Sequence, residues 1–184
     1  MPRSVALLVG SLRKESFSRK VALNLIALAG PDLAPSIVEI GALPLYNPDE
    51  EASVPAAWAE FRKRVRAVDA VLFVTPEYNR SVPGLLKNAI DVGSRPHGQS
   101  VWTGKPAAVV SVSPGAIGGF GANHHLRQSL VFLGMPTLQH EAYLGGVENW
   151  FDEKGSIKPP QTREFLRKLL ESFATWIEVN LAKV

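Results

Sequence analysis

The chain has 184 residues, of which 46% are hydrophobic and 20% are charged, which is typical of one folded domain with a substantial core. It contains no cysteine, so disulfides, thiolate catalysis and thiolate metal sites are excluded. The net charge of +3 is spread over mixed charges, which disfavours nucleic-acid binding. No apolar run approaches the roughly 20 residues of a membrane helix, and no signal peptide precedes the first apolar run. We therefore expect a cytoplasmic protein.

Short apolar runs alternate along the chain with longer stretches of helical periodicity. Strands are predicted at residues 5–9, 36–40, 70–75, 107–112 and, more weakly, 136–139. Helices are predicted at residues 17–28, 55–68, 82–92, 121–133 and 161–181. In the last of these, Phe165, Leu169, Phe173 and Trp176 form an expected core-facing stripe. The alternation predicts a single α/β domain over residues 1–184, with a doubly wound parallel sheet and helices on both faces.

In a sheet of this kind, ligands bind beyond the C-terminal ends of the strands, where the winding reverses. Three unusual loops follow predicted strands, namely residues 10–18, 76–83 and 113–121. We expect these loops to converge on one crevice.

The loop after the first strand combines hydroxyl and cationic side chains with the start of a helix. Ser11, Arg13, Ser16 and Ser18 follow Gly10 at close spacing. The first N–H groups of a helix lack internal partners, the helix dipole is positive there, and arginine can donate two parallel hydrogen bonds to a phosphate. The loop therefore predicts a phosphate monoester site. An ordinary strand-to-helix turn with serine caps would have a similar composition.

The second loop reads TPEYNRSVP over residues 75–83. Ser81 is a candidate cap for the next helix, and Pro83 suits its first turn. Glu77, Tyr78 and Asn79 would then lie at the mouth of the crevice, where Tyr78 offers a flat face to a planar ring. A solvated turn with a lone aromatic residue is the alternative reading.

The third loop, SPGAIGGFG at residues 113–121, contains four glycines that would let the backbone approach a ligand closely. It is not the dinucleotide-binding G-x-G-x-x-G pattern, because it follows the fourth strand and has a different spacing. A flexible connector would also explain it.

Several other kinds of site are disfavoured. The sequence has neither the G-x-x-x-x-G-K-[ST] loop of nucleotidases nor the G-x-S-x-G elbow of α/β-hydrolases. His124 and His125 are adjacent, so a helix would point them in different directions, and no metal site is predicted.

Together the loops resemble the NADPH-dependent FMN reductase family of the flavodoxin-like fold, in particular its bacterial quinone and chromate reductases. The matching text is GSLRKESFSRKVA at 10–22, LPLYNPDEE at 43–51, PEYNRSVPGLLKNAIDVGSRP at 76–96, GKPAAVVSVSPGAIGG at 104–119 and HLRQSLVFLGM at 125–135. The resemblance covers nearly the whole chain in the same order. It implies a five-stranded parallel sheet in the order 2-1-3-4-5.

The resemblance also implies which residues bind FMN. Those expected around the phosphate are Ser11, Arg13, Ser16, Phe17 and Ser18, where Ser18 replaces an asparagine common in the family. Those expected beside the isoalloxazine are Pro76, Glu77, Tyr78 and Asn79 on one side, and Ser113, Gly115 and Gly118 on the other. Tyr78, Asn79 and Arg127 would shape the acceptor pocket, and Arg127 and Glu141 would lie near the flavin or pair across a subunit interface.

The function implied by the resemblance is an NAD(P)H oxidoreductase. NADPH or NADH would pass a hydride to bound FMN, and a quinone, azo compound or chromate-like anion would then take the electrons in a ping-pong cycle. No side chain is expected to act as an essential acid or base. The family also implies a homodimer or homotetramer. The alternative is a flavodoxin-like electron carrier or an FMN-binding sensor that does not turn over NAD(P)H.

Overall fold

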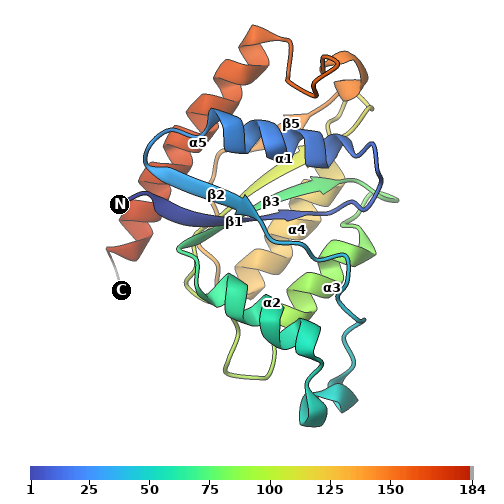
Figure 1. Cartoon of the computed structure of the whole chain (residues 1–184), viewed down its shortest axis with the longest axis vertical. Coiled ribbons are helices and arrows are strands. Elements are labelled where there is room, and N and C mark those ends of the chain that lie inside the picture. The colour runs from blue at the N-terminus through green and yellow to red at the C-terminus, as the bar shows by residue number, and fades with distance from the viewer. Residues whose placement is uncertain (183–184) are drawn as a thin grey trace.

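The computed structural model describes residues 1–182. Its centre is a sheet of five parallel strands, in the spatial order β2-β1-β3-β4-β5 (Figure 1). The strands are β1 (Arg3–Val9), β2 (Leu33–Ile37), β3 (Ala70–Pro76), β4 (Ala107–Val112) and β5 (Ala142–Leu144). The doubly wound topology and the order 2-1-3-4-5 are thus confirmed.

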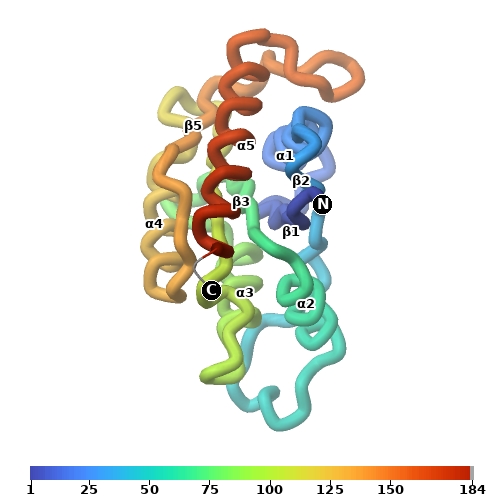
Figure 2. Tube along the Cα trace, turned by 90° about the vertical axis from the view of Figure 1, so that its left-hand side faces the viewer, coloured from blue at the N-terminus to red at the C-terminus, as the bar shows by residue number. Residues whose placement is uncertain are grey.

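Five α-helices connect and cover the strands. They are α1 (Phe17–Leu28), α2 (Ala56–Arg66), α3 (Gly84–Gly93), α4 (Phe120–Phe132) and α5 (Pro160–Leu181), with short 3-10 helices at Pro48–Ser53 and Val147–Asn149. Helices α1 and α5 pack on one face of the sheet, and α2, α3 and α4 pack on the other (Figures 1 and 2). None of the helices within residues 1–182 combines the length and apolar character needed to cross a membrane.

Burial on both faces explains why the central strands are continuously apolar. In β1, Val5 and Leu7 contact the α1 and α5 layer, whereas Ala6 and Leu8 contact the layer of α2, α3 and α4. Successive side chains of a strand point to opposite faces, so a strand covered on both sides needs apolar residues at every position.

Two strands lie elsewhere than the sequence predicts. β2 covers Leu33–Ile37 rather than residues 36–40, because an edge strand tolerates Pro35. The fifth strand was expected at residues 136–139, yet only Thr137 forms an isolated bridge there, with Ala107. The chain then leaves the ladder, and regular pairing with β4 resumes at Ala142–Leu144.

The predicted stripe on α5 is partly wrong. Phe165 is 43% exposed, and its neighbour Leu166 is fully buried instead. Leu169 and Phe173 are buried as expected, and Trp176 is partly buried. Phe165 and Leu166 both lie three or four residues before Leu169, so the spacing fits a stripe that begins at either residue. Packing against the sheet decides that Leu166 is the buried one.

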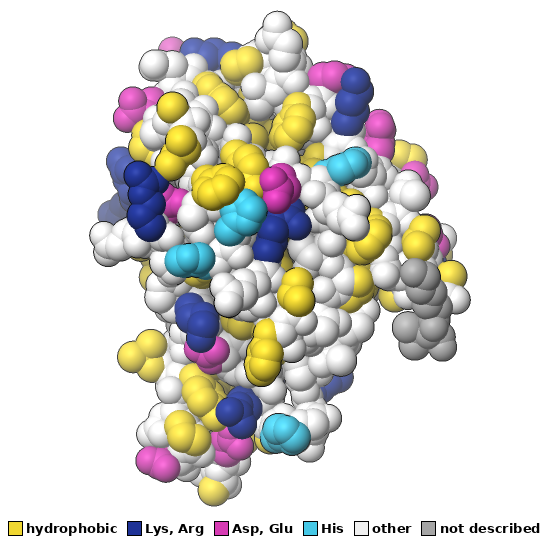
Figure 3. Space-filling model, turned by 180° about the vertical axis from the view of Figure 1, so that it is seen from behind, with side chains coloured by type: hydrophobic (Ala, Val, Ile, Leu, Met, Phe, Trp, Pro, Cys, Tyr) yellow, Lys and Arg dark blue, Asp and Glu magenta, His cyan; other side chains and the backbone are white. Residues whose placement is uncertain are grey.

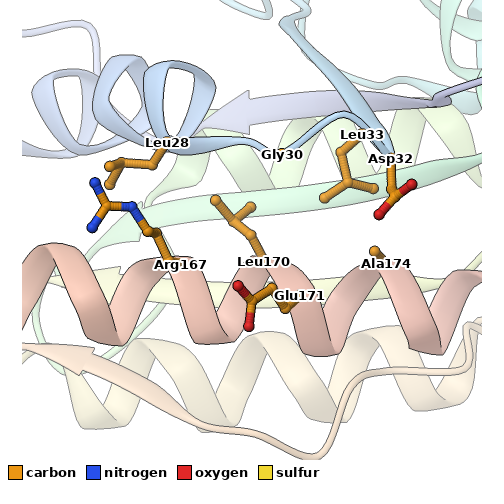
Figure 4. A pocket seen from close by; sticks show the side chains of 8 residues that line it. All are labelled: Leu28, Gly30, Asp32, Leu33, Arg167, Leu170, Glu171 and Ala174. Carbon is orange, nitrogen blue, oxygen red and sulfur yellow. The ribbon is translucent and has the colours of Figure 1, made fainter.

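A cavity of about 250 Å³ lies between the end of α1, the start of β2 and α5 (Figure 4). Leu28 and Leu33 line one wall, and Leu170 lines the other. Because this cavity is at the N-terminal end of β2, it lies at the opposite edge of the sheet from the three predicted loops.

Candidate functional site

The three predicted loops meet at the C-terminal edge of the sheet. In Figure 1 the arrowheads of β1 and β3 point to this edge, where the loops that follow them lie. A Cβ atom added to Gly10 would lie 3.1 Å from Pro76 Cδ, so the first and second loops touch. A Cβ atom on Gly119 would lie 3.6 Å from that of Glu77, so the second and third loops also touch. We call these segments, residues 10–17, 76–81 and 113–119, the loop cluster.

The first loop places hydroxyl groups around the N-terminus of α1. Ser16 caps the helix, because its Oγ accepts a hydrogen bond from the Arg19 amide at 3.1 Å. Ser11, Ser16 and Ser18 are all buried. No residue in the first turn of α1 is acidic, and the nearby Glu15 pairs with Lys20 at 2.7 Å. A helix N-terminus with hydroxyl donors and no competing carboxylate fits a phosphate group.

Arg13 is an exposed cation of this loop, next to the exposed Lys14. Its guanidinium lies 5.8 Å from the centroid of the Phe17 ring, and its amide donates to Ser11 Oγ at 3.3 Å. The Phe17 ring in turn stacks on Phe151, with 6.1 Å between centroids. The ring of Phe17 is therefore a packing element that supports Arg13, and the group that Phe17 can offer an anion is its backbone amide.

The second loop is a tight turn. Tyr78 and Ser81 exchange two backbone hydrogen bonds of 3.1 and 3.0 Å, and the two residues between them, Asn79 and Arg80, have φ angles of 51° and 63°. The prediction that Ser81 caps the next helix is wrong, because the N-cap residue of α3 is Pro83, two residues later, and Ser81 Oγ lies 3.0 Å from His125 Nδ1 instead. The Tyr78 ring is 51% exposed and stands free to stack on a planar group.

The side chain of Glu77 faces α4. Its Oε1 accepts from Arg80 at 3.0 Å, and its Oε2 accepts from the Ala122 amide at 3.1 Å. The carboxylate thus supplies the side-chain cap that the N-cap residue of α4, Gly119, does not have. With both carboxylate oxygens engaged, the backbone of Glu77 is the part that is left to face a ligand.

The third loop is held by the protein on several sides. Ser113 Oγ accepts from the Gly115 amide at 3.0 Å, and Ser111 Oγ donates to the Gly118 carbonyl at 2.7 Å. Gly118 has a φ of 60°, and a Cβ atom there would lie 2.6 Å from the carbonyl carbon of Tyr143. Gly118 is therefore required by close packing on β5, whatever ligand the loop binds.

Arg127, predicted in the acceptor pocket, is half-buried between α4 and the segment that leads into β5. Its guanidinium donates to Asn123 Oδ1 at 2.8 Å and to the carbonyls of Leu138 and His140 at 2.8 and 3.1 Å. Burial lowers the pKa of Arg127, although the nearby Glu141 opposes this shift. Arg127 thus satisfies carbonyls where the fifth strand is interrupted, which is a structural task.

Sequence reasoning missed a group of aromatic side chains on α4 and β5. The Phe120 ring centroid lies 4.2 Å from that of His124 and 5.4 Å from that of Tyr143. The Tyr143 hydroxyl lies 2.9 Å from His124 Nε2, and Glu141 approaches the same nitrogen at 3.9 Å. Burial, and then the neighbouring Glu141, raise the pKa of Tyr143 to about 12. Only the four-residue spacing of Phe120 and His124 is visible in the sequence.

Comparison with known proteins identifies the family. A family model described as NADPH-dependent FMN reductase matches residues 3–149. A quinone reductase of Pseudomonas putida is 64% identical over 181 residues, covering 97% of each chain. A 2-hydroxy-1,4-benzoquinone reductase of a Burkholderia species is 42% identical over 178 residues, covering 96% of this chain and 97% of the relative.

A solved structure agrees with this result. The flavoenzyme NAD(P)H:(acceptor) oxidoreductase FerB of Paracoccus denitrificans superposes with a TM-score of 0.91 at 41% identity, covering 97% of this chain and 98% of that one. The chain therefore belongs to the NADPH-dependent FMN reductase family. It is an FMN-dependent oxidoreductase that uses NAD(P)H, as the resemblance of its loops implied.

Proposed function

We propose that this enzyme reduces quinones with NAD(P)H in a ping-pong cycle, using FMN held by the loop cluster. The observation that carries the proposal is the N-terminus of α1, where buried serine hydroxyls and an exposed arginine adjoin the turn that bears Tyr78. When bound, the flavin supplies the redox chemistry, taking a hydride from NAD(P)H and giving two electrons to the acceptor.

The phosphate end of FMN fits the first loop. Ser11, Ser16 and Ser18 would donate hydroxyl hydrogen bonds beside the free amides of the first turn of α1, and Arg13 would add a bidentate, charge-assisted contact. The ring system would lie between the second and third loops. There it would meet Pro76, Glu77 and Asn79 through their backbone, with Ser113 and Gly115 on the other side.

Tyr78 and Asn79 would receive the planar substrates. The half-exposed Tyr78 ring provides an aromatic face for a nicotinamide or a quinone, and the amide of Asn79 can hydrogen-bond a carbonyl oxygen. The relatives at 64% and 42% identity are a quinone reductase and a 2-hydroxy-1,4-benzoquinone reductase, which supports quinones above azo compounds or chromate as acceptors.

A spectroscopic titration tests this function. The purified protein is loaded with FMN, freed of excess flavin, and mixed anaerobically with NADPH and then with 1,4-benzoquinone. We expect the flavin absorbance to bleach with NADPH and to return with the quinone, and initial-rate plots to give parallel double-reciprocal lines. A flavin that stays oxidised in NADPH and NADH would indicate an electron carrier or a sensor instead.

We also propose that the protein is a homo-oligomer, a dimer or a tetramer, that associates through α3 and α4. A groove of about 430 Å³ between these helices is lined in part by Ile90, Phe132 and Leu133. Phe132 is 89% exposed and the adjacent Val131 is 68% exposed. Figure 3 shows the face that carries α4, where hydrophobic side chains lie among charged ones. An isologous contact with a second copy would remove these side chains from water.

A further inference from the structure

Glu77 contacts two different elements through its two carboxylate oxygens. Oε1 accepts from the Arg80 guanidinium at 3.0 Å, and Oε2 accepts from the Ala122 amide in the first turn of α4 at 3.1 Å. The Glu77 side chain is only 11% exposed, whereas that of Arg80 is 72% exposed. The carboxylate is thus a largely buried link between the 78–81 turn and α4.

The 78–81 turn, which Glu77 contacts, has an unfavourable backbone conformation. Asn79 and Arg80 both have positive φ, as in a type I′ turn, where Asn-Gly is the favoured pair. Asparagine tolerates this region, but an arginine there is strained by contact between its Cβ atom and the backbone. Such a conformation persists only when surrounding contacts hold it, and the ion pair with Glu77 is such a contact.

The turn also lies directly on α4. A Cβ atom on Gly121 would be 2.7 Å from the Arg80 carbonyl oxygen and 2.9 Å from Glu77 Oε2, so glycine is the residue that allows this approach. A second link comes from Ser81, whose Oγ lies 3.0 Å from His125 Nδ1. The turn, the third loop and α4 therefore form one interlocked unit at the C-terminal edge of the sheet.

We propose that Glu77 is a positioning residue, which locks the 78–81 turn onto α4 and so fixes where the Tyr78 ring stands over the flavin. Both carboxylate oxygens are engaged by donors within the protein, so Glu77 acts through Tyr78 and not as a proton donor. The last step, from Tyr78 to the substrate, rests on the proposed function. The step from Glu77 to the turn does not.

Amide hydrogen exchange in the flavin-free protein tests the first step. In Glu77→Ala, the amides of Ser81 and Ala122 should exchange about tenfold faster, as expected when a hydrogen bond to a charged group is lost. Glu77→Gln keeps an oxygen for Ala122 but loses the ion pair, so the Ser81 amide alone should be affected. Unchanged exchange at both amides in Glu77→Ala would overturn the proposal, whatever the enzyme's activity.

A second variant, Arg80→Gly, distinguishes loss of the Glu77–Arg80 contact from a general destabilisation of the protein. Glycine adopts positive φ without strain, so Arg80→Gly should keep the turn closed without the ion pair. In the double variant Glu77→Ala/Arg80→Gly, protection should return at Ser81 but not at Ala122. If protection at Ser81 does not return in the double variant, Glu77 does not act by stabilising the strained backbone conformation of Arg80.

Steady-state kinetics of the FMN-loaded enzyme test the second step. Glu77→Ala should raise the KM for 1,4-benzoquinone several-fold with a smaller change in kcat, and the double variant should recover most of the KM. Glu164→Ala, which removes an exposed carboxylate of α5, is the matched control and should change neither constant. A wild-type enzyme without quinone turnover would refute the proposed function, whereas an unchanged KM in Glu77→Ala would refute only the role of Tyr78 positioning.

Discussion

At the scale of single residues, the first loop combines buried serine hydroxyls with an exposed arginine. Ser11, Ser16 and Ser18 are buried, and the amides of Arg13 and Arg19 donate to Ser11 Oγ and Ser16 Oγ. Arg13 is exposed and steadied by the Phe17 ring. Ser18 is buried in the first turn of α1, and we expect its hydroxyl to donate to the phosphate in place of the asparagine that the resemblance implies.

We expect Arg13→Ala to weaken FMN binding by about 1.5–3 kcal/mol, because it removes charge-assisted hydrogen bonds to the phosphate. Quenching of FMN fluorescence during titration of the flavin-free protein measures the affinity. Lys63, an exposed lysine of α2, provides the control, and Lys63→Ala should bind FMN like the wild type. Equal affinities for Arg13→Ala and the wild type would show that the phosphate lies elsewhere.

At the scale of elements, hydrogen bonds join the N-terminal ends of β1 and β3, on the side of the sheet opposite the loop cluster. Asp69 Oδ2 accepts from both the amide and the hydroxyl of Ser4 at 2.7 Å, and the Asp69 amide donates to Ser4 Oγ at 3.0 Å. Burial alone would raise the pKa of Asp69, but the hydrogen bonds from Ser4 and the nearby Arg3 outweigh it and lower this pKa. The carboxylate therefore stabilises the strand pair that carries the loop cluster.

Asp69→Asn should lower the free energy of unfolding at pH 7 by about 1–2 kcal/mol, since an amide accepts these bonds more weakly than a carboxylate. A lowered pKa stabilises the fold above the ordinary value of 3.8, and this contribution is lost as the pH falls through the folded-state value. Urea unfolding at several pH values should therefore show the two proteins converging in acid. Glu60→Gln, on the exposed side of α2, should match the wild type, and a pH-independent gap for Asp69→Asn would contradict this account.

At the scale of the whole molecule, Phe132 and Val131 at the end of α4 are the most exposed large hydrophobic side chains of the α-helices within residues 1–182. The groove between α3 and α4, with Val131 and Phe132 at its side, is the surface that we assign to association. Because these helices also carry the turn and loops of the site, association there would bring two sites into one assembly.

Phe132→Glu should shift the protein toward monomer by placing a charge in the buried interface. Light scattering after size-exclusion chromatography gives the mass. Val179→Glu, a similar change at an exposed position of α5, is expected to leave the mass unchanged. An unaltered assembly in Phe132→Glu would locate the interface elsewhere.

Much of the fold and of the loop cluster could be predicted from the sequence. The continuous apolar runs identified β1, β3 and β4, and helical periodicity identified α1 at residues 17–28, because these signals are local. Motif spacing gave the family and with it FMN and NAD(P)H. The arrangement of the loops followed from a general rule of parallel sheets.

Other features were decided only by tertiary contacts. The fifth strand lies at Ala142–Leu144, where it pairs with β4, and Arg127 satisfies the carbonyls of Leu138 and His140 in the interruption before it. No local pattern reveals these long-range partners. Gly118 and Gly121 resembled ligand-approach glycines, yet they are needed where β5 and the 78–81 turn come close. The cap that Glu77 gives to α4 spans 45 residues. By itself, the sequence determined the central strands β1, β3 and β4 and the family, because continuous apolar runs and motifs are local signals. Long-range packing decided where the two outer strands pair and which side chains hold the loops in place.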